Sequence, residues 1–312
     1  MFSRPLQNLI PLYSFLEEIH TGVSSQIYLV SDPLGNEYAL KLFNKHIDLE
    51  QFETELNNCR ILCNAQNPDF IRYISSSEDD GISKVKYIVF ELAERRSLDN
   101  FISPEIPFDE KSTKFLFWKI AKMAERLHLL YFSHRDLNLH NILLDQNYNL
   151  KLGNFGSAKY FLNQSGKSAL LFGRVGTSCY MAPEMNKKLY DGKKVDIFSL
   201  GVLLLYMRTG KQVFEIHKEK VLNFIKKKQY DKFWFVIEKG NPELHLTHEF
   251  KDLIISMLDY NPNNRPDISD VFNHPWLDEI NNLDSDAFLS YEANAKTKLK
   301  EIEKTLFDKL NK

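Results

Sequence analysis

Short β-type runs and one helical period occupy the first third of the chain. Apolar and β-branched residues concentrate in three runs separated by turn residues: 25–30, 37–43 and 85–92. Between the second and third runs, apolar residues recur at the spacing of one helical face: Phe52, Leu56, Cys59 and Leu62. The pattern predicts a small β lobe with one amphipathic helix, over about residues 16–93.

From about residue 95 onward, the apolar positions follow longer helical periods. Two examples of such a face are Leu116, Ile120, Met123, Leu127 and Leu130, and Phe250, Leu253, Ile254, Met257 and Leu258. The segment 196–207 is apolar on nearly every side, which predicts a helix buried at the centre of a mainly helical lobe. Together the two halves predict an α+β fold with a β-rich lobe and a helical lobe.

A charged tail with one narrow apolar stripe follows the second lobe. The stripe consists of Leu299, Ile302, Leu306 and Leu310. We expect this helix to dock on its own domain, because a single narrow stripe cannot select a partner; a partner-binding or dimer helix is the alternative. The predicted divisions are an N-terminal extension (1–15), a domain (16–277, with lobes 16–93 and 94–277) and the tail (278–312).

Composition and charge narrow the class of protein. The 312 residues carry 40 Lys plus Arg against 42 Asp plus Glu, a net charge of −2. This balance argues against nucleic acid or anionic lipid as a partner bound by the charge of the whole chain, and it leaves a local basic face open. The three cysteines form no CxxC pair, which indicates a reducing compartment. No apolar stretch approaches the roughly 20 residues of a membrane span, and prolines and acids interrupt the N-terminus where a secretory signal would be apolar. We expect a cytoplasmic protein, with a nuclear location as the alternative.

Five short motifs stand in a fixed order along the chain. His134-Arg135-Asp136-Leu137-Asn138-Leu139-His140-Asn141 matches the HRDLxxxN catalytic loop, and Asn154-Phe155-Gly156 follows where that pattern expects Asp-Phe-Gly. Further motifs are Tyr38-Ala39-Leu40-Lys41 on a predicted strand, Met181-Ala182-Pro183-Glu184, and Asp196-Ile197-Phe198-Ser199-Leu200-Gly201. Five motifs at the right intervals leave little room for chance.

With these motifs, residues 16–277 resemble a eukaryotic protein kinase, most like the serine/threonine kinases of the calcium/calmodulin-dependent and related groups. The resemblance implies a two-lobed kinase fold with ATP in the cleft between the lobes, Mg²⁺, and a protein substrate with a serine or threonine hydroxyl. It implies that Asp136 accepts the proton of this hydroxyl. Lys41 would hold the ATP phosphates while ion-paired to a helix glutamate, for which we take Glu55. The alternatives are that Glu53 is this partner, or that the partner's position is occupied by Asn58 and the glutamate is absent.

The resemblance also implies the remaining contacts of the site. The nucleotide-binding residues would be Ile19, Gly22, Ile27, Ala39, Lys41, Glu55, Glu91, Ala93 and Leu143, with Phe90 at the back of the pocket. Asn141 and Asn154 would be the metal ligands. Glu184 and Arg265 match a structural ion pair, and Thr177 is expected to contact Asp136.

Three departures from the family pattern fall on the phosphate and metal side. Of the glycines in GxGxxGxV, only Gly22 is present in residues 20–27, and Asn138 replaces the lysine usual after the catalytic aspartate. Asn154 replaces the aspartate that carries charge to the metal ion. The attraction between unit charges about 4 Å apart is roughly 4 kcal/mol, and a divalent ion increases it. If solvent and the ATP phosphates recover half of this attraction, the remaining loss is roughly 3 kcal/mol, which lowers the rate about a hundredfold.

These features leave two main functional hypotheses and one minor one. The first is a protein serine/threonine kinase with weakened activity, because Asp136, Lys41, Asn141 and Glu55 are present. The alternative is a pseudokinase that acts as a nucleotide-binding scaffold or regulatory module. A kinase acting on a small molecule is the least favoured, since the segment 182–184 is of the protein-kinase type.

Overall fold

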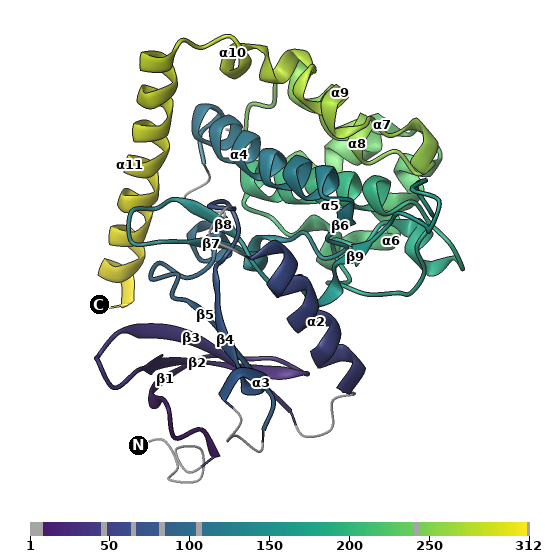
Figure 1. Ribbon diagram of the computed structural model, residues 1–312. Helices are drawn as coiled ribbons and strands as arrows, with labels where there is room; N and C mark the ends of the chain where they lie inside the picture. Colours follow the sequence, from purple (N-terminus) through teal and green to yellow (C-terminus); the bar gives the residue numbers. More distant parts are fainter. Residues whose placement is uncertain are drawn as a thin grey trace. The chain divides into compact units, whose positions relative to one another are not determined.

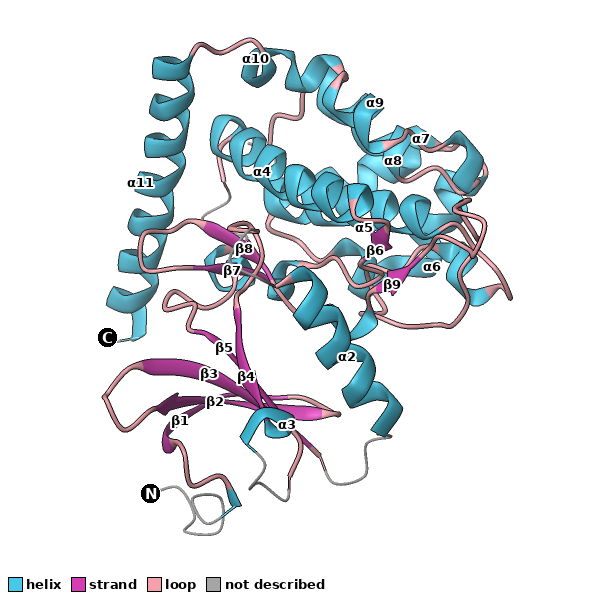
Figure 2. Ribbon diagram, viewed as in Figure 1, coloured by secondary structure: helices cyan, strands magenta, loops and turns pink. Residues whose placement is uncertain are grey.

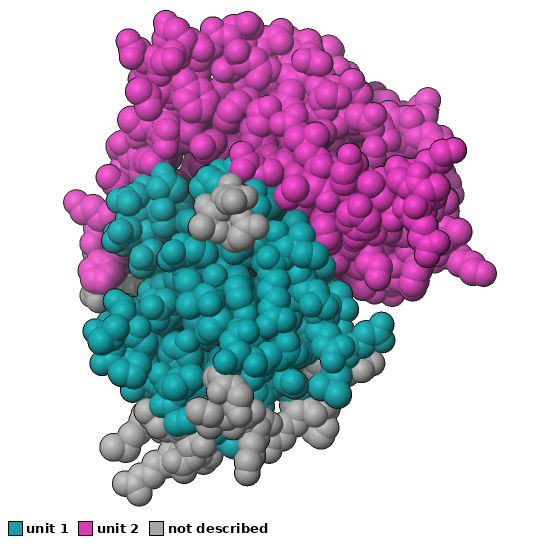
Figure 3. All heavy atoms as spheres, viewed as in Figure 1, with its two compact units in different colours: residues 1–96, 143–156 teal, residues 97–142, 157–312 magenta. Residues whose placement is uncertain are grey.

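The chain is described here from a computed structural model, which covers residues 9–44, 49–63, 67–80, 85–103, 108–239 and 244–310. It divides into two compact units, residues 1–96 with 143–156, and residues 97–142 with 157–312 (Figure 3). Strands predominate in the first unit and helices in the second (Figure 2). The predicted α+β class, with a β-rich and a helical lobe, is confirmed.

The first unit is built on a five-stranded antiparallel sheet with strand order β1-β2-β3-β5-β4 (Figure 1). Its strands are β1 (Ser14–Thr21), β2 (Ser25–Ser31), β3 (Glu37–Phe43), β4 (Tyr73–Ser76) and β5 (Tyr87–Glu91). The three predicted runs correspond to β2, β3 and β5, whereas the pattern misses β1 and β4. Because β1 begins at Ser14 and Ile10 is buried in the core of this unit, part of the predicted N-terminal extension belongs to the sheet unit.

Side chains alternate between the two faces of this sheet. Leu40 and Leu42 of β3 pack in a cluster with Ile10. On the other face, Phe43 and Ile88 pack with Phe52 and Leu56 of the helix α2 (Leu49–Leu62), which is the predicted amphipathic helix. The smaller elements are α3 (Ser77–Asp80), the paired strands β7 (Ile142–Leu144) and β8 (Leu150–Leu152), and the 3₁₀ turn η3 (Phe155–Ser157).

The second unit is organised around one buried helix. Its α-helices are α4 (Glu110–Leu129), α5 (Gly192–Thr209), α6 (Val213–Lys226), α7 (Tyr230–Glu238), α8 (His248–Met257), α9 (Ile268–Phe272), α10 (Asp278–Asn281) and α11 (Ser285–Leu310). The paired strands β6 (Phe132–Ser133) and β9 (Lys159–Tyr160) and the 3₁₀ turns η1 (Leu98–Phe101), η2 (Leu139–Asn141), η4 (Pro183–Asn186), η5 (Pro262–Asn264) and η6 (Pro275–Leu277) complete it.

Helix α5 is the central helix that the sequence predicts. It packs against α4 and α8, and nearly all of its side chains are buried. Asp191 caps its N-terminus by accepting the N–H of Lys193 at 2.8 Å. Gly210 ends it in the left-handed conformation, with φ 65°.

The tail helix α11 docks on α4 of its own unit, as expected from its apolar stripe. Leu299 and Ile302 are fully buried, and the Phe288 ring lies 5.5 Å from that of Phe115. Leu306 is half-buried, and the side chain of Leu310 lies outside the described residues. Among the helices that the structure describes, none has the length and apolar content to span a membrane.

Candidate active site

Lys41 forms the centre of a polar cluster within the first unit. Its Nζ lies 2.5 Å from Glu55 Oε1, and the Glu55 side chain is only 3% exposed. Glu53, the alternative partner, is exposed on α2, and Asn58 instead donates its amide to the carbonyl of Phe155 at 2.9 Å. The structure therefore selects Glu55. A charge this buried is costly without its partner, so the pair fixes the position of the Lys41 ammonium.

Asn154 is the second partner of Lys41. Its Oδ1 accepts a hydrogen bond from Lys41 Nζ at 3.2 Å, and its backbone is left-handed, with φ 61°, a conformation that asparagine tolerates well. Two residues later, a Cβ on Gly156 would lie 2.6 Å from Glu55 Oε2, so a larger residue there would push against the ion pair. Phe155 between them packs on Phe70, with ring centroids 5.4 Å apart.

The predicted nucleotide-binding residues of the sheet lie on one face. Ile27 is the register partner of Lys41, and Ala39 is that of Phe90, so these four side chains share the face that carries Lys41. Ile19 is half-buried on β1, and Gly22 closes the β1–β2 hairpin by donating its N–H to the Ser25 carbonyl at 2.9 Å.

The other predicted nucleotide-binding residues lie at the end of β5, just after it, or on β7. Glu91 pairs with Lys151, with Oε1 and Nζ 2.7 Å apart, and Ala93 is buried two residues further on. Leu143 lies against Gly153, where an added Cβ would be 3.0 Å from Leu143 Cδ1. The first unit thus contains all the predicted nucleotide-binding residues.

Asp136 is held by neutral groups within the second unit. Its Oδ1 accepts hydrogen bonds from Thr177 Oγ1 and from Asn138 Nδ2, both at 2.8 Å. Its Oδ2 accepts one from Asn141 Nδ2 at 3.1 Å. The expected contact between Thr177 and Asp136 is confirmed.

Asn138 and Gly176 are site residues whose contributions the motif comparison missed. Asn138 caps η2 by accepting the N–H of His140 at 3.0 Å, and it donates to Thr177 Oγ1 at 3.0 Å. Gly176 has φ 95°, and a Cβ there would overlap the carbonyl oxygen of Arg135. In the sequence, only their positions indicate a role in the site: Asn138 lies two residues after Asp136, and Gly176 directly precedes Thr177.

Buried Asp196 anchors the segment that carries Asp136. Its carboxylate accepts the backbone N–H of His134 at 2.9 Å and that of Arg135 at 2.8 Å, and His128 Nε2 lies 2.9 Å away. Burial alone would raise the pKa of Asp196, but the contact with His128 and the backbone donors lower it below its ordinary value. Asp196 is therefore a buried, ionised anchor.

Two positively charged side chains donate hydrogen bonds to backbone carbonyls of the segment 157–181. Arg135 donates to the carbonyls of Ser157 at 2.7 Å and Phe172 at 2.9 Å. Lys218 of α6 donates to the carbonyl of Met181 at 2.9 Å. Burial lowers the pKa of Lys218 to about 8.

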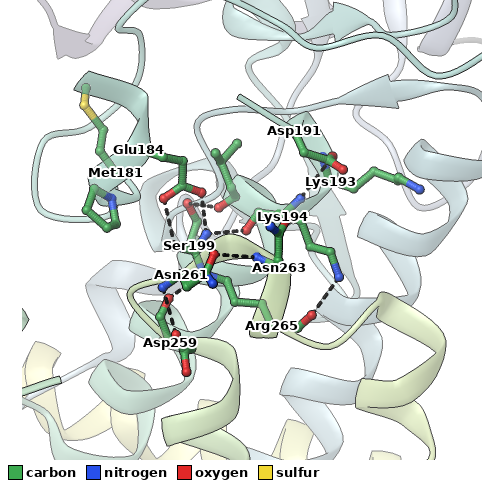
Figure 4. Close-up of polar contacts among 12 residues, drawn as sticks. Met181, Glu184, Asp191, Lys193, Lys194, Ser199, Asp259, Asn261, Asn263 and Arg265 are labelled. Carbon is green, nitrogen blue, oxygen red and sulfur yellow. Dashed lines mark hydrogen bonds and ion pairs between the residues drawn. The ribbon is translucent and has the colours of Figure 1, made fainter. Parts of the chain in front are cut away.

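Glu184 and Arg265 form the predicted ion pair. Two parallel contacts join them, at 2.5 Å and 2.8 Å, and Figure 4 shows the carboxylate facing the guanidinium group. Arg265 is buried and also donates to the carbonyls of Asp259 and Lys194. A buried guanidinium group that joins three separate segments in this way fits an architectural role.

The predicted metal ligands match Mg²⁺ in donor type but not in charge. Asn141 and Asn154 each offer an amide oxygen, a group that Mg²⁺ accepts, but neither offers the negative charge of a carboxylate. The Asn154 oxygen also lies 3.2 Å from the Lys41 ammonium. In the described part of the chain, no cluster of three or more His, Cys, Asp and Glu side chains could hold a metal ion.

Comparisons with known proteins agree with the motifs. Residues 13–277 match the family described as protein kinase domain. The chain is 30% identical over 278 residues to serine/threonine-protein kinase chk1 of Schizosaccharomyces pombe, covering 85% of this chain and 53% of that protein. It is 30% identical over 275 residues to calcium/calmodulin-dependent protein kinase type II subunit delta of Oryctolagus cuniculus, covering 85% and 49%.

A third similar protein is testis-specific serine/threonine-protein kinase 1 of Mus musculus. The identity is 34% over 202 residues, which cover 61% of this chain and 51% of that protein. The chain spans about half the length of these relatives.

Proposed function

Because the chain belongs to the protein kinase family, we propose that it transfers the γ-phosphate of ATP to a serine or threonine hydroxyl of a protein, at a rate lowered by Asn154. The ion pair between Lys41 and Glu55 is the observation that carries this proposal. A lysine fixed in this way is the part of the family's machinery that positions the ATP phosphates. The similar proteins named as serine/threonine kinases support the choice of hydroxyl.

The reaction assigns one task to Asp136. The substrate oxygen forms a bond to the γ-phosphorus while the bond from that phosphorus to the bridging oxygen of ADP breaks, and the hydroxyl proton passes to the Asp136 carboxylate. Hydrogen bonds from Thr177, Asn138 and Asn141 hold this carboxylate in place.

Asn154 is the reason for the lowered rate. Bound Mg²⁺ neutralises charge on the phosphates, and Asn141 and Asn154 are the residues of this chain that would hold it. An amide in place of a carboxylate removes roughly 3 kcal/mol of attraction, which corresponds to about a hundredfold in rate. Asn138 lowers the rate further, because it leaves no lysine beside Asp136.

A pseudokinase is the second candidate function. The uncharged Asn154 favours it, because Glu55 holds the Lys41 ammonium in place while an amide at position 154 brings no negative charge to a metal ion. Such a module would bind nucleotide and act as a scaffold or regulator without chemistry.

Phosphate transfer to casein and to myelin basic protein separates the two functions. Radiolabelled ATP would be incubated with the natural chain, with Asp136→Ala and, as a control outside the site, with the exposed-residue variant Asp308→Ala. We expect the natural chain and Asp308→Ala to transfer phosphate at equal rates, either to the substrate or to their own side chains. The rate of Asp136→Ala should be at least a hundredfold lower. Equal labelling by the natural chain and Asp136→Ala, together with thermal stabilisation by ATP, would establish the pseudokinase.

A further inference from the structure

A groove of about 850 Å³ lies on helices α6 and α7 of the second unit, which pack against each other. We call it the α6–α7 groove; it is lined chiefly by Ile216, Lys220, Phe224, Lys232, Phe235 and Lys239. None of these residues has a place in the proposed phosphate transfer.

Apolar side chains in this groove are open to solvent. Ile216 is 74% exposed and Phe235 is 69% exposed. The branched aliphatic residues Val213 and Val236 line the same groove. Large apolar side chains that gather in a concave, polar-rimmed surface are typical of a protein interaction site.

The groove is also strongly basic, although the chain as a whole is slightly acidic. In the part of the chain that the structure describes, four lysines line it, Lys211, Lys220, Lys232 and Lys239, against the one carboxylate of Asp231. Among the described residues, none of these four lysines is ion-paired with a carboxylate. Lys211 Nζ instead donates to the carbonyl of Lys239 at 2.8 Å, which holds its charge at the groove.

We propose that the α6–α7 groove binds a partner protein through an extended acidic segment that carries hydrophobic side chains. The lysines supply charge complementarity to aspartates and glutamates, and Ile216 and Phe235 supply contact area for the hydrophobic residues between them. The volume accommodates several side chains but no folded domain.

Other occupants fit the groove less well. A nucleic acid strand is bound by aromatic rings on which successive bases stack, whereas Ile216, the most exposed apolar side chain of this groove, is aliphatic. A membrane surface is bound by an apolar face that inserts into lipid, whereas this apolar surface lines a hollow. The proposal does not depend on whether the chain transfers phosphate.

Fluorescence anisotropy with a labelled peptide tests the proposal. The probe is a short peptide in which glutamates alternate with leucines and phenylalanines; two control peptides replace the glutamates by lysines or the apolar residues by alanines. We expect the probe alone to bind, and its affinity to fall as salt is raised. Equal affinity for the probe and either control peptide would overturn the proposal, and so would tighter binding of polyuridylic acid or of vesicles containing phosphatidylserine.

Matched variants locate the binding site. Lys220→Glu is expected to weaken binding of the probe about tenfold, whereas Lys227→Glu, the same charge change at the end of the same helix but outside the groove, is expected to leave it unchanged. Phe235→Ala should weaken binding about fivefold or more, and Phe307→Ala, which truncates an equally exposed phenylalanine of α11, should not. Circular dichroism would verify that each variant is folded. Binding that is the same within each pair of folded variants would contradict the proposal.

Discussion

At the residue scale, the carboxylate of Asp136 is positioned by amide and hydroxyl groups, while that of Asp196 is buried and ionised. Asn138 and Asn141 both direct their amide nitrogens to Asp136, on opposite carboxylate oxygens. Asp196, in contrast, accepts two backbone N–H groups of the segment that leads into Asp136. We therefore expect Asp136 to affect activity and Asp196 to affect stability.

Asp196 predicts a specific dependence of stability on pH. Its pKa in the folded chain lies below the unfolded value near 3.8, so its stabilising contribution is fully present above about pH 4 and is lost as the pH falls through the folded pKa. Asp196→Asn should lower the free energy of unfolding by about 1–3 kcal/mol at pH 7. The difference from the natural chain should shrink below pH 4, as measured by urea unfolding at several pH values.

The exposed residue Asp308 provides the control for this experiment. Asp308→Asn should change the free energy of unfolding by less than about 0.5 kcal/mol at every pH. A loss in Asp196→Asn that is unchanged below pH 4 would show that the role of Asp196 does not depend on its charge.

At the scale of elements, the tail helix α11 belongs to the packed core of the second unit. Its Phe288 ring lies 5.5 Å from Phe115 and 5.3 Å from Trp118 of α4. Lys111 of α4 lies over the ring of Tyr291, 4.2 Å from its centroid. We infer that α11 stabilises the second unit.

Two leucines of α11 test this role. Leu299 is fully buried, whereas Leu289, ten residues earlier, is 60% exposed. Leu299→Ala should lower the free energy of unfolding by about 2–4 kcal/mol, because it leaves a cavity in the packed interface. Leu289→Ala should lower it by less than about 1 kcal/mol. Equal small effects in denaturant titrations would show that the helix does not stabilise the chain.

The sequence predicted those elements whose pattern is set by burial. The periodicity of α5 follows from burial on all sides, and β2, β3 and β5 are rich in apolar residues because they lie inside the sheet. β1 could not be found in this way, because it is an edge strand with the sequence SFLEEIHT and is mostly exposed. β4, at the other edge, has only four residues, too few to show an alternation.

Within the candidate site, the motifs predicted the residue identities and some contacts, such as that between Thr177 and Asp136, but not the contacts of Asn138. The sequence could not decide whether Glu55, Glu53 or Asn58 is at the position of the Lys41 partner. The structure decides it, because Glu55 lies on the buried side of α2 next to Lys41 and Glu53 lies on the exposed side. The role of Asn138 depends on Thr177, thirty-nine residues away, and no local pattern reports such a distance. The family motif has a lysine at this position, so it predicts nothing about the contacts of an asparagine there.

At the scale of the whole molecule, each unit contributes its own part of the proposed reaction. Lys41, Glu55 and Asn154 are joined within the first unit, and Asp136, Asn138 and Asn141 within the second. Position 154 departs from the family motif by a missing charge, and the proposed function attributes the lowered rate chiefly to this charge.

The rate of phosphate transfer as a function of Mg²⁺ concentration, at saturating ATP, tests this claim most directly. Asn154→Asp should raise the maximal rate about a hundredfold and should reach half of it at a lower Mg²⁺ concentration. The natural chain should stay above Asp136→Ala at high Mg²⁺. A rate in Asn154→Asp equal to that of the natural chain, at every Mg²⁺ concentration, would contradict the account.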